Sequence, residues 1–79
     1  MTLHDFNQTN LSTFELENDA ATLRVFQNCL GWEWETETDE GLVGSEADFC
    51  TAEDALEDLL TSEDADGAVA LFTQERDHG

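Results

Sequence analysis

The segment Trp32–Thr38 alternates strictly between glutamate and large or β-favouring residues. A period of two matches the pleat of a β-strand, in which successive side chains point to opposite faces. We therefore expect a half-buried strand in which Trp32, Trp34 and Thr36 face inward and the glutamates face solvent. To satisfy this pattern, the chain must form a sheet with one covered face.

The residues after this segment predict a β-hairpin over residues 32–45. Asp39–Gly41 supply turn chemistry, and Leu42–Ser45 give an apolar return strand. We expect Phe49 to anchor the loop that follows the hairpin.

A helix is predicted from Thr51 onward. Thr51 and Asp54 have the spacing of a capping-box-like pair. The apolar residues that follow fall on one helical face: Ala52, Ala55, Leu56, Leu59 and Leu60. This face is expected to pack on the core.

Residues 19–30 fit two patterns, and the sequence leaves both open. A helix would use an apolar stripe with a signal at each end: Leu23, Phe26 and Leu30, with Asp19 as N-cap and Gly31 after the last turn. A strand would use the alternation of Leu23 and Val25.

The remaining segments carry weaker patterns. Leu11–Leu16 places Phe14 and Leu16 in alternation, which favours a short strand. Residues 64–67 form an acidic turn, and Ala68–Phe72 is a short β-compatible run.

Together these segments predict an α+β fold, with a small antiparallel sheet and one or two packed helices. A chain of 79 residues is expected to form one domain, and it buries only about 60% of its unfolded surface. The domain is expected to span residues 1–79, with frayed ends at residues 1–10 and 74–79.

Acidic residues dominate the chain, because 20 Asp and Glu stand against two arginines and no lysine, for a formal net charge of −18. Glu33, Glu35 and Glu37 share one face of the predicted strand. Residues two apart on such a face are separated by about 6.6–6.8 Å. This spacing is close to two nucleotide rises of one DNA strand, at about 3.4 Å each.

The predicted helix repeats this arrangement, with acidic pairs four residues apart. Each like-charge pair destabilises a helix by about 0.2–0.5 kcal/mol at low salt, so we expect the acids to serve a function. The candidate partner-binding residues combine the strand, the turn and the helix: Glu33, Glu35, Glu37, Asp39, Glu40, Glu53, Asp54, Glu57 and Asp58.

Two explanations would account for such a surface. In nucleic-acid mimicry, carboxylates replace phosphates and occupy the basic groove of a nucleic-acid-binding protein or ribonucleoprotein complex. In high-salt adaptation, the acidity belongs to the compartment, and the chain is a small structural or interaction domain. Mimicry is the preferred hypothesis, because Glu outnumbers Asp and bulky Phe and Trp are retained.

In its acidity and small size, the chain resembles small inhibitors encoded by phages and mobile elements, such as anti-CRISPR and anti-restriction proteins and uracil-DNA glycosylase inhibitors. This resemblance implies an inhibitor that binds a host defence or DNA-processing complex.

A second resemblance covers residues 32–60, which look like the hairpin and helix of small YegP-like proteins. Nine residues carry it: Trp32, Trp34, Gly41, Leu42, Val43, Ser45, Phe49, Thr51 and Ala55. It implies fold only. Positions that tend to be basic in that family are Glu33 and Glu35 here.

Other function classes find little support. Carboxylate pairs occur along the whole chain, so no single pair stands out as a catalytic acid and base. Cys29 and Cys50 have only His4 and His78 as candidate bases. We therefore expect no enzyme. Asp64, Asp66 and Gly67 resemble part of a calcium loop, but Thr73 occupies the position that requires glutamate. We expect no metal, cofactor or direct nucleic-acid binding.

Cellular context is expected to be cytoplasmic. The first residues have no basic start and no apolar stretch typical of a signal peptide, and no apolar run approaches the length of a bilayer span. Two cysteines are too few for a disulfide scaffold, so buried thiols are expected. The sequence leaves a homodimer open.

Overall fold

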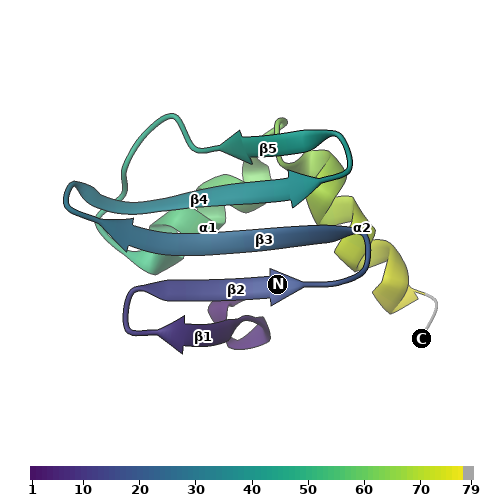
Figure 1. The fold of residues 1–79 in the computed structure, drawn as a ribbon, viewed down its shortest axis with the longest axis horizontal. Helices are drawn as coiled ribbons and strands as arrows, with labels where there is room; N and C mark the ends of the chain where they lie inside the picture. Colours follow the sequence, from purple (N-terminus) through teal and green to yellow (C-terminus); the bar gives the residue numbers. More distant parts are fainter. Residues whose placement is uncertain (78–79) are drawn as a thin grey trace.

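The computed structural model describes residues 1–77, with side chains through residue 72. Five strands form one antiparallel sheet in the order of the chain, β1-β2-β3-β4-β5 (Figure 1). Their bounds are β1 Asn7–Asn10, β2 Thr13–Glu17, β3 Ala21–Asn28, β4 Gly31–Thr38 and β5 Gly41–Gly44. Two helices follow, α1 Ala52–Thr61 and α2 Asp66–Asp77. The predicted α+β class is confirmed.

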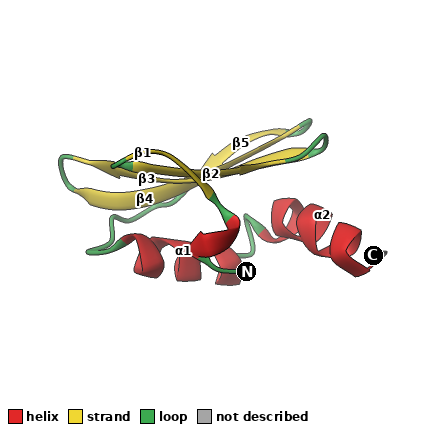
Figure 2. Cartoon of the chain, turned by 90° about the horizontal axis from the view of Figure 1, so that it is seen from below, coloured by secondary structure: helices red, strands yellow, loops and turns green. Residues whose placement is uncertain are grey.

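Both helices lie on the same side of the sheet, as Figure 2 shows. The core fills the space between these two layers. Its most buried side chains are Leu23 and Val25 from β3, Trp34 from β4, and Ala55 and Leu59 from α1. The opposite face of the sheet, here called the open face, has no described helix over it.

The predicted hairpin and helix are confirmed. Strands β4 and β5 pair with Thr36 opposite Val43, and Trp34 and Thr36 are buried. Phe49 does anchor the following loop, because its backbone exchanges hydrogen bonds of 2.7 and 2.8 Å with Trp32. Thr51 caps α1 by accepting a 3.1 Å hydrogen bond from the Asp54 amide.

Residues 19–30, which fitted both helix and strand, contain strand β3. Ala21, Leu23 and Val25 alternate into the core, and β3 pairs with β2 on one side and β4 on the other. Alternation on a strand with two hydrogen-bonded neighbours therefore outweighs the stripe that ends at Leu30, whose side chain is exposed.

The strand-like pattern of Ala68–Phe72 proved misleading, because these residues lie within α2. Ala65, Ala68 and Phe72 are buried, and their spacings of three and four residues are those of one helical face. The run was too short to separate the two periods, since it contains only one helical repeat.

The frayed arm predicted for residues 1–10 is also incorrect. Leu3–Asp5 form a 3₁₀ turn whose start is held by a 2.8 Å hydrogen bond from the Thr2 amide to Asp5 Oδ2. Phe6 enters the core, and β1 pairs with β2. At the other end, α2 continues through residues 74–77, where a frayed tail was predicted, and residues 78–79 lie outside the described residues.

No helix in the described part of the chain is long and apolar enough to cross a membrane.

Among the described glycines, Gly31 lies closest to neighbouring backbone. Its φ is +143°, and a Cβ placed there would lie 2.7 Å from the Phe49 carbonyl oxygen. We expect Gly31→Ala to lower the free energy of unfolding by about 1–3 kcal/mol, because it combines strain with a backbone clash. Urea denaturation measures this change.

Gly67→Ala is the matched control, because nothing lies within 4 Å of a Cβ at that position in α2. Alanine is favoured over glycine in helices by up to about 1 kcal/mol, so this variant should gain stability. Equal effects of the two substitutions would contradict the proposed role of Gly31.

Candidate functional site

The three glutamates of β4 lie on the open face of the sheet. Trp34 and Thr36 point into the core, so the intervening Glu33, Glu35 and Glu37 point the other way. We call this row the β4 ladder. The structure thus brings together the three acids that the alternating sequence predicted on one strand face.

Arg24 partly neutralises the β4 ladder. It lies on β3, in register with Glu15 of β2 and Glu35 of β4. Its Nε donates to Glu15 Oε2 at 2.8 Å, its Nη1 donates to Glu35, and its Nη2 lies 3.8 Å from Glu37 Oε1. The hydrogen bond to Glu15, together with Glu35, raises the pKa of Arg24 above its usual range. A fixed cluster of one cation and three carboxylates therefore occupies this face.

Glu33 sits at the end of the ladder in a different environment. It accepts a hydrogen bond from Asn28 Nδ2, and Asp48 lies nearby. Burial, followed by the charge of Asp48, raises the pKa of Glu33 above its ordinary value of 4.5. Its charge is thus less favourable than that of an isolated surface glutamate.

The acids of α1 divide into two groups. Glu53, Asp54 and Glu57 are exposed. Asp58 is partly buried and accepts a 2.8 Å hydrogen bond from the indole Nε1 of Trp34. Asp58 therefore connects α1 to the sheet, a contact that its position in the acidic sequence did not indicate.

The exposed acids of α1 and the β4 ladder occupy opposite faces of the molecule, because α1 covers the side that Trp34 faces (Figure 2). One flat partner surface cannot contact both arrays at once. The α1 acids instead continue along the chain into the α1–α2 turn.

We call the exposed acids of the helix layer and of the neighbouring β4–β5 turn the helix-side acidic surface. It comprises Asp39, Glu40, Glu53, Asp54, Glu57, Glu63, Asp64 and Asp66. None of these residues forms an ion pair with a described side chain. Among the described side chains, this surface therefore carries no ion pair, whereas the open face carries the Arg24 pairs.

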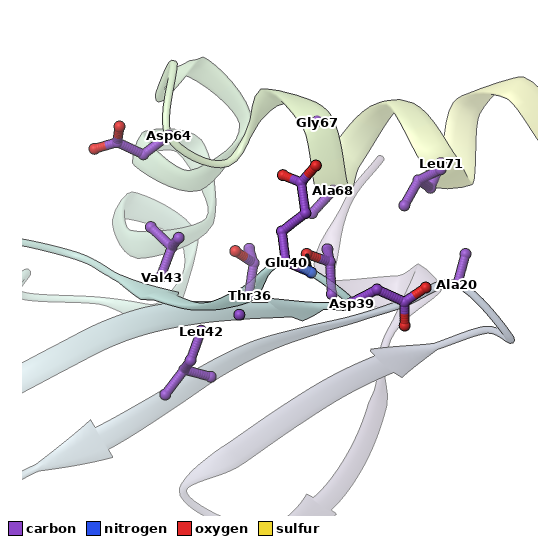
Figure 3. Close-up of a pocket in the computed structure, with 12 residues that line it drawn as sticks. Ala20, Thr36, Asp39, Glu40, Leu42, Val43, Asp64, Gly67, Ala68 and Leu71 are labelled. Atoms are coloured by element: carbon purple, nitrogen blue, oxygen red, sulfur yellow. Dashed lines mark hydrogen bonds between the residues drawn. The ribbon is translucent and has the colours of Figure 1, made fainter.

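A groove of about 530 Å³ opens between the β4–β5 turn and α2 (Figure 3). Its lining includes Asp39 and Glu40 from the turn and Asp64 from the α1–α2 connection. Thr36, Val43, Ala68 and Leu71 also line it. Sequence analysis selected the two turn acids but missed the groove, because it did not predict α2. The helical spacing of Ala65, Ala68 and Phe72 was the available signal.

Both cysteines are free and exposed, which corrects the prediction of buried thiols. Cys29 lies in the β3–β4 turn, and Cys50 lies just before α1. Neither residue falls on an inward-facing position, so the usual preference of cysteine for burial does not apply here. Among the described residues, no group of three His, Cys, Asp or Glu is arranged to hold a metal ion.

Comparisons of the chain with protein-family models, curated proteins and solved structures give no match.

The Trp34–Asp58 contact yields a stability prediction. Asp58→Ala leaves a buried indole N–H without its acceptor, so the free energy of unfolding should fall by about 1–3 kcal/mol. Asp58→Asn keeps a side-chain oxygen and should lose less. Urea denaturation with tryptophan fluorescence checks both values.

Glu57→Ala is the control, because it removes one exposed acid from the neighbouring position. Its effect should stay within about 0.5 kcal/mol. If Asp58→Ala behaves like Glu57→Ala, the hydrogen bond does not stabilise the fold.

Proposed function

We propose that the protein is a non-enzymatic, nucleic-acid-mimicking inhibitor that binds a basic nucleic-acid-binding protein or ribonucleoprotein complex. The helix-side acidic surface is the contact. The observation that carries this proposal is the uneven distribution of charge compensation. Arg24 pairs with acids of the open face, while the helix side retains exposed carboxylates with no described cationic neighbour.

The geometry of α1 supports this assignment. Glu53 and Glu57 are four residues apart, which corresponds to about 6 Å along a helix at a rise of 1.5 Å per residue. Two nucleotide rises of one DNA strand span a similar length, about 6.8 Å. Exposed carboxylates at this interval can meet arginine and lysine side chains that are spaced to contact phosphates.

Electrostatics also supports a basic partner. An uncompensated negative surface speeds association with a positive groove, and its attraction falls as salt rises. Nucleic acid itself would be repelled. The proposed complex therefore forms between proteins and competes with DNA or RNA for the same basic groove.

Competition with DNA tests the proposal directly. The chain is immobilised, and nuclease-treated lysate of its source cells is passed over it at constant moderate salt. Bound protein is then challenged with duplex DNA or with an equal concentration of an uncharged polymer. DNA should release a nucleic-acid-binding protein that the uncharged polymer leaves bound. If DNA releases nothing, the mimicry proposal fails.

Two matched triple variants locate the contact. Glu53→Gln, Asp54→Asn and Glu57→Gln remove three charges from the helix side, and Glu33→Gln, Glu35→Gln and Glu37→Gln remove three from the open face. The helix-side variant should retain the fold by circular dichroism and weaken capture by at least about tenfold, roughly 1.4 kcal/mol. Equal losses in both variants would show that bulk charge, not the helix side, drives binding.

Adaptation to high salt is a second candidate, and the presence of acids on both faces of the sheet favours it. Thermal melts at about 0.1 M and about 2 M salt separate the two functions, since screening lengths differ several-fold between these conditions. A mimic should be folded at the lower salt. Loss of the folded baseline there, with recovery at the higher salt, would favour the halophilic domain.

A further inference from the structure

The sheet ends in two edge strands that differ in how they are protected. The pairing of β1 with β2 shifts register between Gln8 and Asn10, an irregularity that disrupts the ladder at that edge. β5 has no charged residue and no proline, and it pairs with β4 in continuous register. Apart from its short length of four residues, β5 therefore lacks the usual devices that prevent a further strand from pairing.

The backbone of β5 directs hydrogen-bonding groups outward. Just after β5, the Ser45 amide donates to the Trp34 carbonyl oxygen at 2.9 Å. Along an antiparallel strand, residues that bond the neighbouring strand alternate with residues that do not. Val43 therefore bonds toward β4, while Leu42 and Gly44 direct their N–H and C=O groups away from it. In the described part of the chain, no strand pairs with this outer edge.

The side chains of β5 leave this edge accessible to another backbone. A Cβ built at Gly41 has nothing within 4 Å, and one built at Gly44 meets only the Trp34 carbonyl oxygen, at 3.7 Å. Glycine within a strand often marks a place where another backbone approaches closely. Leu42 is 62% exposed and points away from the helix layer (Figure 3). A strand added to β5 would gain backbone hydrogen bonds and cover this leucine.

The charge around β5 selects the occupant of the edge. Glu37 lies opposite Leu42 on the open face, and its side chain is 59% exposed. Asp39 and Glu40 are exposed in the turn that precedes β5. A second copy of the chain would bring a second set of these acids to the same edge, at a formal net charge of −18 for each copy. A cationic segment would be attracted there instead.

We infer that β5 binds an extended segment of a protein partner, in which basic residues alternate with apolar ones, as an added strand of the sheet. The segment bonds the outward backbone groups of Leu42 and Gly44, and its apolar side chains cover Leu42. Its basic side chains, on the other face, meet Asp39 and Glu40. The inference rests on the proposed function for the basic character of the partner and names the way in which that partner is held.

A short peptide tests the edge without the partner. The probe is an acetylated, amidated pentapeptide of alternating lysine and valine. Its control carries backbone N-methyl groups at two consecutive central residues, which block both edges of the peptide strand and leave its charge unchanged. The probe should give saturable ¹H–¹⁵N NMR shifts at Leu42, Val43 and Gly44, and the control should bind at least about tenfold more weakly. Equal binding of the control, or no shifts up to about 10 mM probe, would overturn the inference.

Amide exchange with water gives a readout specific to strand addition. With the probe at about ten times its dissociation constant, exchange of the Leu42 and Gly44 amides should slow by about tenfold. Exchange of the Val43 amide, which already bonds toward β4, should change much less. Uniform slowing across all three residues, or none, would show that the peptide does not pair with this edge.

Leu42→Pro tests the same hydrogen bonds from the side of the protein. It removes an outward N–H and no bond to β4, and proline is tolerated at edge positions of this kind. Binding of the probe should weaken by at least about fivefold with an unchanged circular dichroism spectrum. Leu42→Ala keeps the N–H and should weaken binding less, so equal losses in the two variants would contradict backbone pairing. If proline disturbs the fold, the N-methyl comparison decides on the wild-type chain.

Two double variants test the choice of a basic occupant. Asp39→Asn with Glu40→Gln should weaken the probe by about threefold, the scale of two exposed charge pairs. Glu53→Gln with Asp54→Asn removes the same charge from α1, and the dissociation constant should stay within about twofold of the wild type. Equal weakening would show attraction by bulk charge and would overturn the inference.

Sedimentation of the chain alone tests for a second copy on the edge. The free protein should be a monomer whose Leu42 and Gly44 amides exchange rapidly with water. A dimer in which these two amides are protected would place a second copy on β5 and overturn the inference.

The outcomes also separate this inference from the proposed function. Pairing of the probe with β5, without a DNA-released partner on the column, would retain the edge site and reject mimicry. A DNA-released partner whose capture is unchanged by Leu42→Pro would retain mimicry and reject the edge site.

Discussion

The packing of Trp34 between the sheet and α1 is the interaction on which the rest of the structure depends. Its ring is 2% exposed, and it belongs to the same core as Val25 and Leu59. An indole in such a place needs an acceptor for its N–H, and Asp58 supplies one from α1. This contact joins the layers and also fixes which face of β4 is covered. The glutamates on either side of Trp34 must then lie on the open face, so core and charge pattern have one origin.

Local periodicity was sufficient to predict the β4–β5 hairpin and α1. In β4, inward-facing residues such as Trp34 and Thr36 alternate with glutamates over the length of the strand. Thr51 supplies a cap whose hydrogen bond involves only the nearby backbone. The patterns failed where a segment was short or polar. The residues of β1 pair with β2 through backbone hydrogen bonds, which require no apolar side chains and leave no trace in hydropathy. Ala68–Phe72 was too brief to distinguish a strand from α2.

The sequence was sufficient to predict which acids belong to the candidate site, but not which partners they contact. The sequence identified the acids of β4 and α1, yet it could not show that Arg24 would reach Glu15 and Glu35, 9 and 11 residues away along the chain. The Asp58 contact with Trp34 spans 24 residues. Such pairs depend on strand register and on which helical face meets the sheet. Two acids that look alike in sequence therefore differ in environment, since Asp58 accepts a hydrogen bond from Trp34 and Glu57 faces solvent.

Arg24 makes the two faces of the molecule differ in charge, because it pairs with acids of the open face. Three carboxylates surround this side chain on the open face, where strand pairing holds them close together and their repulsion would otherwise be greatest. The exposed acids of α1, Glu53, Asp54 and Glu57, project from the helix into water, where repulsion is weaker and is reduced further by salt. Arg24 thus lies where the backbone forces the acids together, and no described side chain forms an ion pair with the exposed acids of the helix side. A groove with an acidic rim opens beside these exposed acids. The helix side is therefore where a cationic partner would gain most, because no ion pair among the described side chains has to be broken there.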